Sequence, residues 1–272
     1  MSQGFKAGLI HLTPIVVSLL FSVGCACLLM TSAMELYSVT PFPESPVGSL
    51  GNAIYFVALV GFGAFIIFLL LKKRNYRLIV LVTGFALTSA TFLLSMVYIY
   101  AFSLVFVPLP LELIVAVSAA TSFAVGYVIL GTKSRLGDFI VVLLGGSLGT
   151  LLGACIQTLS AVLILCFLSI YDAFAVYRGP VGKIAHAGLE KLRGLSFSFK
   201  DLQMGLGDLT FYSMLVGHML LYFGVSSCAA SMVGVLLGCL LAFKTLERMG
   251  VFPGLPIPIS LGLAFGFLAA LI

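Results

Sequence analysis

The sequence predicts an all-α polytopic membrane protein with nine transmembrane helices. Of its 272 residues, 61% are hydrophobic and 8% are charged, and apolar stretches of about 18 residues or more recur from end to end. Because the lipid interior offers no water to backbone polar groups, each span is expected to be a helix. The predicted spans cover about 9–30, 51–71, 78–101, 111–130, 139–155, 157–177, 204–223, 225–243 and 254–272.

The first span is predicted to stay in the protein as a helix. Lys6 precedes its apolar run and Thr31-Ser32-Ala33 follows, as in a secretory signal. The run of about 22 residues is longer than the apolar region of such signals. We expect one transmembrane domain over 1–272, with helices one to six at about 9–177, a loop at about 178–203, and helices seven to nine at about 204–272.

Basic residues separate the later spans and orient the chain. With nine spans they all fall on one side, and the other side has no lysine or arginine, so the N-terminus is predicted to be cytoplasmic and the C-terminus external. The net charge of +5 then reflects topology and contact with anionic membrane lipids, not nucleic acid. The residues are Lys6, Lys72-Lys73-Arg74, Arg77, Lys133, Arg135, the basic residues of 178–203, Lys244 and Arg248.

Glycines at four-residue spacing predict close helix packing in three spans. They are Gly145, Gly149 and Gly153 in the fifth span, Gly234 and Gly238 in the eighth, and Gly262 and Gly266 in the ninth.

Two carboxylates, Asp172 and Asp208, fall inside predicted spans. Asp172 lies six residues before Arg178, hence about 9 Å from the cytoplasmic boundary, and Asp208 lies four residues past the start of its span, hence about 6 Å inward. The sixth and seventh spans run in opposite directions, so adjacent helices would bring the two side chains face to face.

These carboxylates indicate acid–base chemistry. Placing one in a membrane costs roughly 2.5–3.5 kcal/mol, and neither has a lysine or arginine in its span. A close pair would share a proton, so that one member can deprotonate a water while the other protonates a carbonyl oxygen. The alternative is that each aspartate makes a separate structural contact.

Three short motifs stand at the cytoplasmic ends of predicted helices: Tyr171-Asp172, Gly205-Leu206-Gly207-Asp208 and Pro253-Gly254-Leu255-Pro256. In this order they resemble the presenilin family of intramembrane aspartyl proteases, with its YD, GxGD and PALP motifs and its nine-helix, presenilin-like fold. The resemblance implies that Asp172 and Asp208 are catalytic and that the other motif residues contact the substrate. Gly254 stands where the family has alanine.

The charge distribution and the proline motif favour the presenilin type over the related signal peptide peptidases, which are inverted in the membrane. With its short external loops, the chain is similar to a microbial, archaeal-type homologue of the presenilin family. The glycines before Asp208 leave its backbone open to a peptide. The prolines make the last helix start abruptly. Prolines also commonly mark the start of a helix without any role in a functional site.

The loop at 178–203 joins the two aspartate-bearing helices. Ile184, Leu189, Leu192 and Leu195 among basic residues suggest an amphipathic surface helix. Residues 195–199 alternate apolar and polar as a short strand would, and the resemblance implies a gate there that captures an unwound substrate by β-augmentation. A plain connector fits the sequence equally well.

Other chemistries fit less well. Gly145-Gly146-Ser147-Leu148-Gly149 satisfies GxSxG, but Ser147 and His218 differ in predicted depth by about 9 Å. A zinc protease needs HExxH or an equivalent, which is absent, and His11, His186 and His218 share no helix face. Prepilin-type peptidases share GxGD but not the nine spans.

The prediction is therefore a multipass aspartic endopeptidase that hydrolyses peptide bonds within transmembrane segments and needs no metal or organic cofactor. In a prokaryote it would reside in the cell membrane. The alternative outside enzymology is a transporter or channel with the aspartates as a proton or cation relay, although such sites tend to lie near the midplane between repeats. The sequence leaves open the physiological substrate, any accessory subunit, cleavage of the loop and oligomerisation.

Overall fold

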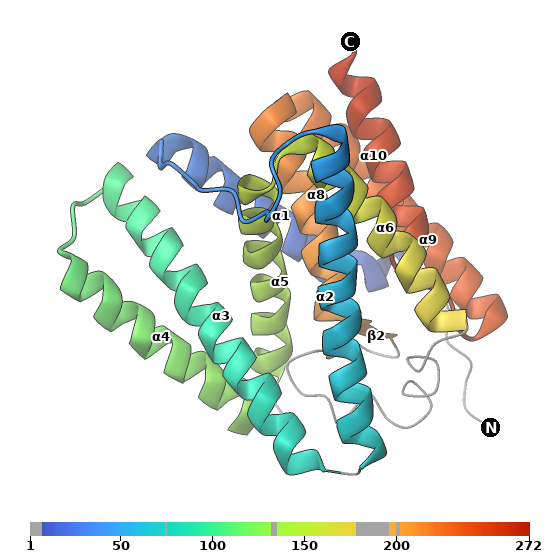
Figure 1. The fold of residues 1–272 in the computed structure, drawn as a ribbon, viewed down its shortest axis with the longest axis horizontal. Helices are drawn as coiled ribbons and strands as arrows, with labels where there is room; N and C mark the ends of the chain where they lie inside the picture. Colours follow the sequence, from blue (N-terminus) through green and yellow to red (C-terminus); the bar gives the residue numbers. More distant parts are fainter. Residues whose placement is uncertain (1–6, 74, 132–134, 178–195, 200–201) are drawn as a thin grey trace.

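The computed structural model describes the chain apart from residues 1–6, 74, 132–134, 178–195 and 200–201 (Figure 1). The described part contains nine α-helices and one two-stranded hairpin. A 3-10 turn, η1 (Leu9–Leu12), precedes the helices α1 (Thr13–Ser32), α2 (Pro46–Lys72), α3 (Tyr76–Val105), α4 (Leu111–Gly131), α5 (Arg135–Cys155), α6 (Thr158–Tyr177), α8 (Leu206–Phe223), α9 (Val225–Met249) and α10 (Pro256–Ala270). The predicted nine helices are confirmed.

Seven of these helices are long and apolar enough to cross a membrane: α1 with its preceding turn, α2, α3, α4, α5, α6 and α9. The two others are shorter, with 18 residues in α8 and 15 in α10. Helix α8 also carries the polar Asp208 and His218. The count of nine spans and the orientation of the termini therefore stay predictions.

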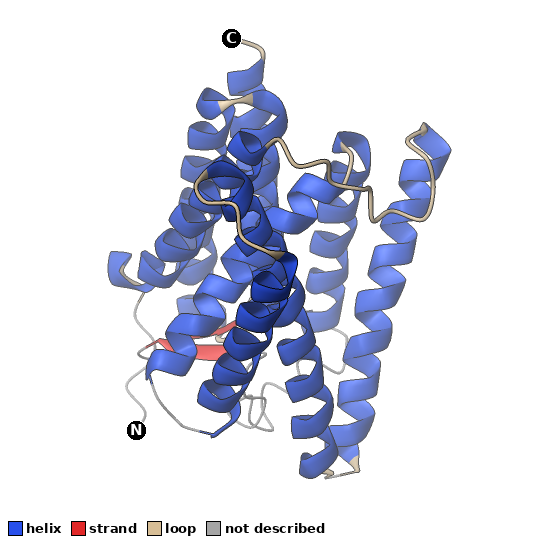
Figure 2. Ribbon diagram, turned by 90° about the vertical axis from the view of Figure 1, so that its left-hand side faces the viewer, coloured by secondary structure: helices blue, strands red, loops and turns tan. Residues whose placement is uncertain are grey.

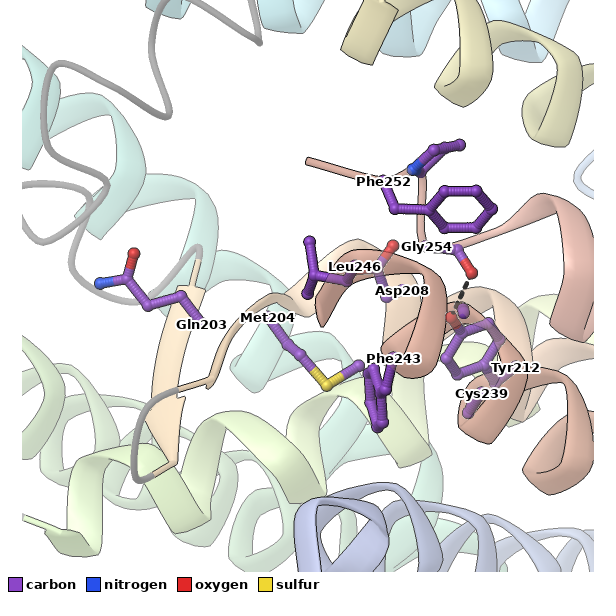
Figure 3. A pocket seen from close by; sticks show the side chains of 11 residues that line it. Gln203, Met204, Asp208, Tyr212, Cys239, Phe243, Leu246, Phe252 and Gly254 are labelled. Carbon is purple, nitrogen blue, oxygen red and sulfur yellow. Dashed lines mark hydrogen bonds between the residues drawn. The ribbon is translucent and has the colours of Figure 1, made fainter. Parts of the chain in front are cut away.

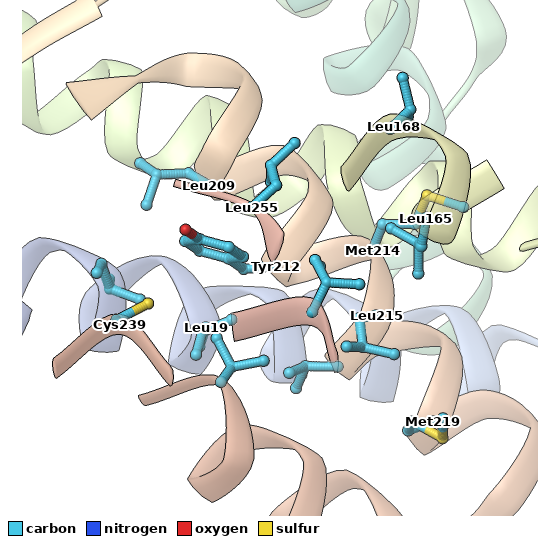
Figure 4. Close-up of a cluster of buried hydrophobic side chains, with 14 of the residues drawn as sticks. Leu19, Leu165, Leu168, Leu209, Tyr212, Met214, Leu215, Met219, Cys239 and Leu255 are labelled. Atoms are coloured by element: carbon cyan, nitrogen blue, oxygen red, sulfur yellow. The ribbon is translucent and has the colours of Figure 1, made fainter. Parts of the chain in front are cut away.

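The helix ends alternate between the two ends of the bundle. The end of α2, the start of α3, the hairpin and the start of α10 lie toward one end, while the C-terminus lies at the other (Figures 1 and 2). Helix α8 packs against α1, α5, α6, α9 and α10. Its side chains form much of the buried apolar core, where Leu209, Tyr212 and Leu215 are each at most 1% exposed (Figure 4).

Close approach of α5 to α8 depends on the predicted glycines. A Cβ added to Gly149 would overlap the backbone oxygen of Thr210 and lie 2.7 Å from the backbone nitrogen of Met214. A Cβ on Gly153 would lie 2.6 Å from the Met214 carbonyl oxygen. In the same way, Gly234 and Gly238 lie against the backbone of α10. The prediction of glycine-mediated helix packing is confirmed.

Gly149→Ala is expected to lower stability, by roughly 1–3 kcal/mol, because backbone atoms of α8 cannot move aside as a flexible side chain can. The measurement is the thermal unfolding midpoint in detergent. The matched control is Gly63→Ala in α2, where an added Cβ meets nothing within 4 Å. Equal midpoints for the two variants would contradict this role of Gly149.

Hydroxyl groups also tie α8 to α1 and α5. Ser18 Oγ and Ser213 Oγ are 3.3 Å apart, Ser22 donates to the Ser213 carbonyl at 3.1 Å, and Ser22 Oγ lies 2.7 Å from Thr150 Oγ1. In an apolar bundle such bonds help to fix one arrangement of the helices, since an unpaired hydroxyl would be costly. They help to fix the position of α8, and with it that of Asp208.

The hairpin before α8 comprises β1 (Ser196–Phe199) and β2 (Leu202–Gly205), paired antiparallel with Ser196 opposite Gly205. The strand expected within 195–199 is confirmed. The partner strand was not predicted, and because it occupies Leu202–Gly205, helix α8 begins at Leu206 instead of about 204. The last helix begins at Pro256 instead of about 254, because proline is accommodated best in the first helical turn. The proposed amphipathic helix at 184–195 lies outside the described residues.

Candidate active site

Asp208 stands in the first turn of α8, at its third residue. The preceding Gly205 is extended, with φ −77° and ψ 146°, and ends β2 where the helix starts. Because the first backbone N–H groups of a helix have no partner within it, a carboxylate is favoured at this position. The hairpin and the helix start therefore place Asp208 at one end of the bundle.

Asp172 lies on α6 and meets the proline motif. Its Oδ2 accepts a hydrogen bond of 3.0 Å from the backbone N–H of Leu255. The neighbouring residue, Gly254, lies against the other carboxylate, because a Cβ added there would be 3.1 Å from Asp208 Oδ1 and 3.2 Å from Asp208 Oδ2. Two consecutive residues thus contact both aspartates, and both aspartates are partly buried.

The proline motif is a short, well-packed connection between α9 and α10. Pro253 and Leu255 are buried, and Leu255 joins the core beside Tyr212 and Leu209 (Figure 4). Pro256 is the first residue of α10. Packing on both sides of Gly254 holds its backbone next to the carboxylates.

A small pocket opens beside Asp208 (Figure 3). Its cavity volume is about 90 Å³, whereas one water needs roughly 10–15 Å³. The site can therefore hold several waters next to a carboxylate. The lining consists of Gln203, Met204, Asp208, Tyr212, Cys239, Ala242, Phe243, Leu246, Phe252, Pro253 and Gly254.

Sequence reasoning missed most of this lining. Tyr212 follows Asp208 by four residues, a spacing that places both on the same helix face, so its position could have been inferred. Its hydroxyl donates to the Gly254 carbonyl oxygen at 2.7 Å. Cys239, Phe243 and Leu246 on α9 carry no comparable signal, because only the packing of α9 against α10 brings them to the site.

Of the eight predicted contact residues, only Pro253 and Gly254 line this pocket; the six that do not are Tyr171, Gly205, Leu206, Gly207, Leu255 and Pro256. The ring of Tyr171 faces α2, 3.6 Å from where a Cβ on Gly61 would be. Leu206 packs toward Gly145 of α5, with Cδ1 3.4 Å from the Cβ position there. Gly207 is exposed. Asp208, Pro253 and Gly254 do line the pocket, Asp172 joins them through Leu255, and Gly205 adjoins Asp208.

The serine alternative finds no support in the geometry. Ser147 donates its hydroxyl to the carbonyl of Leu144 in its own helix. Both ring nitrogens of His218 are engaged elsewhere, Nδ1 at 2.7 Å from the Gly153 carbonyl and Nε2 at 3.1 Å from Thr158 Oγ1. A nucleophile and its base must be hydrogen-bonded to each other, which these residues are not.

Known proteins show the same fold and family. A family model described as "Signal-peptide peptidase, presenilin aspartyl protease" matches residues 15–188. Over 120 residues the chain is 32% identical to Presenilin-B of Dictyostelium discoideum. The matched segment covers 39% of this chain and 24% of that protein.

Two crystal forms of a presenilin family intramembrane aspartate protease have a fold similar to nearly the whole chain. For the form in space group P2 the TM-score is 0.68, the identity is 21%, and 98% of this chain and 99% of the other are covered. For the C222 form the TM-score is also 0.68, at 21% identity, with 96% and 98% covered. The presenilin-like fold is confirmed.

Proposed function

This chain belongs to the family of signal-peptide peptidase and presenilin aspartyl proteases, and from that premise we propose that it hydrolyses peptide bonds within transmembrane segments. It is an integral multipass membrane protein, in keeping with its family and its seven span-length helices. Asp172 and Asp208 are the proposed catalytic pair. The observation that carries this proposal is that adjacent residues meet the two carboxylates: the Leu255 N–H donates to Asp172, and Gly254 lies against Asp208, with little room for a side chain between them.

The proposed reaction uses one proton shared by the pair. Close carboxylates do not both ionise readily, so one is charged and the other neutral. The ionised member accepts a proton from a water in the pocket as the water oxygen bonds to the scissile carbonyl carbon, and the neutral member protonates the carbonyl oxygen. Collapse of this intermediate breaks the C–N bond: the departing nitrogen takes the proton that the first carboxylate accepted from the water, and a hydroxyl proton of the intermediate returns to the second, which restores the pair.

The described geometry supports binding of an extended substrate near Asp208. A peptide bond inside a helix must be unwound before its carbonyl can be reached. The β1–β2 hairpin leads directly into α8, and within the described residues each strand is paired with the other. We therefore expect an outer edge of this hairpin to bind the unwound segment by β-augmentation. The proposed partners are transmembrane proteins that enter from the bilayer.

The proposed orientation places the site toward the cytoplasm. The basic clusters at 72–77 and 244–248 would then face the cytoplasm, in agreement with the positive-inside rule. Gly205 and the Pro253-Gly254-Leu255-Pro256 motif are proposed to border the bound substrate. Tyr171, Leu206 and Gly207 are proposed to influence binding from outside the pocket.

The test is hydrolysis of a fluorogenic transmembrane peptide by the purified protein in proteoliposomes, with products identified by mass spectrometry. We expect cleavage within the hydrophobic segment. A peptidomimetic with a hydroxyl isostere of the tetrahedral intermediate should inhibit at least about a hundredfold better than the same peptidomimetic without the hydroxyl. A proton or cation relay has no reason to distinguish the two compounds, so equal effects together with ion flux would favour a transporter.

A further inference from the structure

We propose that Tyr212 is a positioning residue that orients the hydrogen-bond donor of Asp172 through a single peptide group. This inference rests on the proposed function of the site. It concerns the bond between Gly254 and Leu255, whose carbonyl and N–H point to different helices. The carbonyl accepts from Tyr212 on α8, and the N–H donates to Asp172 on α6.

The two hydrogen bonds are coupled because a peptide group is planar and rigid. Rotation of the carbonyl away from Tyr212 would turn the N–H away from Asp172 by the same angle. The distances are 2.7 Å from Tyr212 Oη to the Gly254 oxygen and 3.0 Å from the Leu255 nitrogen to Asp172 Oδ2. A hydrogen bond accepted at the carbonyl also polarises the group and strengthens its N–H as a donor.

Tyr212 is itself held firmly, which a positioning residue requires. Its side chain is 1% exposed and lies in the core with Leu209, Leu255 and Cys239 (Figure 4). It stands one helical turn after Asp208, so the same face of α8 presents both Asp208 and Tyr212 toward Gly254 (Figure 3). Helix α8, which carries Asp208, thereby sets the direction of the Leu255 N–H that donates to Asp172.

This peptide group has a further role because Gly254 also lies close to Asp208, where an added Cβ would be 3.1 Å from Asp208 Oδ1. A tilt of the group would change the surroundings of both carboxylates at once. The ionisable side chains that face it among the described residues are Asp208 and Tyr212 on α8, Asp172 on α6 and Cys239 on α9. A hydrogen-bond donor to the ionised form of Asp172 favours that form. Loss of this donor should therefore move the acidic limb of the profile of kcat against pH to higher pH.

The experiment compares Tyr212→Phe with the matched control Tyr98→Phe in the proteoliposome cleavage assay. Tyr98 on α3 also donates to a backbone carbonyl at 2.7 Å, that of Ser147 on α5, and it does not line the pocket. Both variants lose one hydroxyl and one tyrosine–carbonyl bond. We expect Tyr212→Phe to lower kcat about tenfold or more with KM changed less than about twofold, and to shift the acidic limb upward. Tyr98→Phe should leave kcat and the pH profile as in the wild type.

The outcomes separate the inference from the proposed function. If the wild-type protein cleaves the peptide and Tyr212→Phe has the same kcat and pH profile, the inference about Tyr212 is overturned but the proposed function stands. A loss of kcat in Tyr212→Phe that Tyr98→Phe matches, together with an equal fall in Tm, would also overturn it, because both variants would then act through stability. A wild-type protein that cleaves no transmembrane peptide would refute the proposed function and this inference with it.

Discussion

Asp172→Asn and Asp208→Asn are each expected to lower the rate of peptide cleavage at least about a thousandfold. Neither amide can accept the proton of the attacking water or supply a proton to the carbonyl oxygen, and the two steps need both members of the pair. Because the members act as one unit, we expect the double variant to be little worse than either single variant. The measurement is the initial rate of cleavage in proteoliposomes.

The asparagine variants should still fold. Asparagine has nearly the volume of aspartate, and its side-chain oxygen can still accept the Leu255 N–H that Asp172 accepts at 3.0 Å. The matched control is Glu112→Gln, which removes a carboxylate from the first turn of α4, on an exposed residue. We expect the control to retain wild-type activity. Substantial cleavage by either folded aspartate variant would be incompatible with a shared-proton mechanism.

Gly254→Val is expected to lower kcat by about a hundredfold, the second largest effect. An added Cβ would be 3.1–3.2 Å from the carboxyl oxygens of Asp208, and valine carries two further methyl groups on that carbon. The carboxylate or the backbone of the proline motif would have to move. A displacement of about 1 Å at a reacting group is enough to cost two orders of magnitude in rate.

Gly254→Ala provides a graded comparison. The resembled family motif has alanine here, and the Asp208 side chain can give way by a few tenths of an ångström into the adjacent pocket. We therefore expect a loss of kcat of about tenfold or less, clearly smaller than that of valine. Gly24→Ala, where an added Cβ meets nothing within 4 Å, serves as the control. If valine and alanine at 254 both leave kcat unchanged, close contact between Gly254 and Asp208 is not required for the reaction.

The apolar runs and the charged groups between them predicted the helices well. Each predicted span corresponds to a helix in the structure, and most boundaries agree within a few residues. The departures are local. Helix α2 begins at Pro46 rather than about 51, because Ser45 caps it by accepting from the N–H of Gly48. A capping serine acts through one hydrogen bond and changes the local hydropathy little, so a hydropathy profile does not detect it.

The candidate site was predictable in its aspartates and less so in its surroundings. Asp172 and Asp208 stood out because carboxylates are rare in apolar spans. Tyr171 and Leu206 share their motifs but face α2 and α5, since the direction of a side chain depends on which neighbours its helix meets. Cys239 looks like an ordinary core residue in the sequence, yet it lines the pocket, and Tyr212 is marked only by its four-residue spacing from Asp208.

By itself the sequence determined the helical, membrane-spanning class and the two carboxylates, because local hydrophobicity and the cost of an intramembrane charge depend on composition alone. The tertiary structure decided which groups meet those carboxylates. The Gly254–Leu255 peptide lies more than 40 residues after Asp208 in the chain, and only the packing of α6, α8, α9 and α10 brings its carbonyl to Tyr212 and its N–H to Asp172. Hydrogen bonds between distant segments depend on packing geometry, which no local pattern of residues encodes.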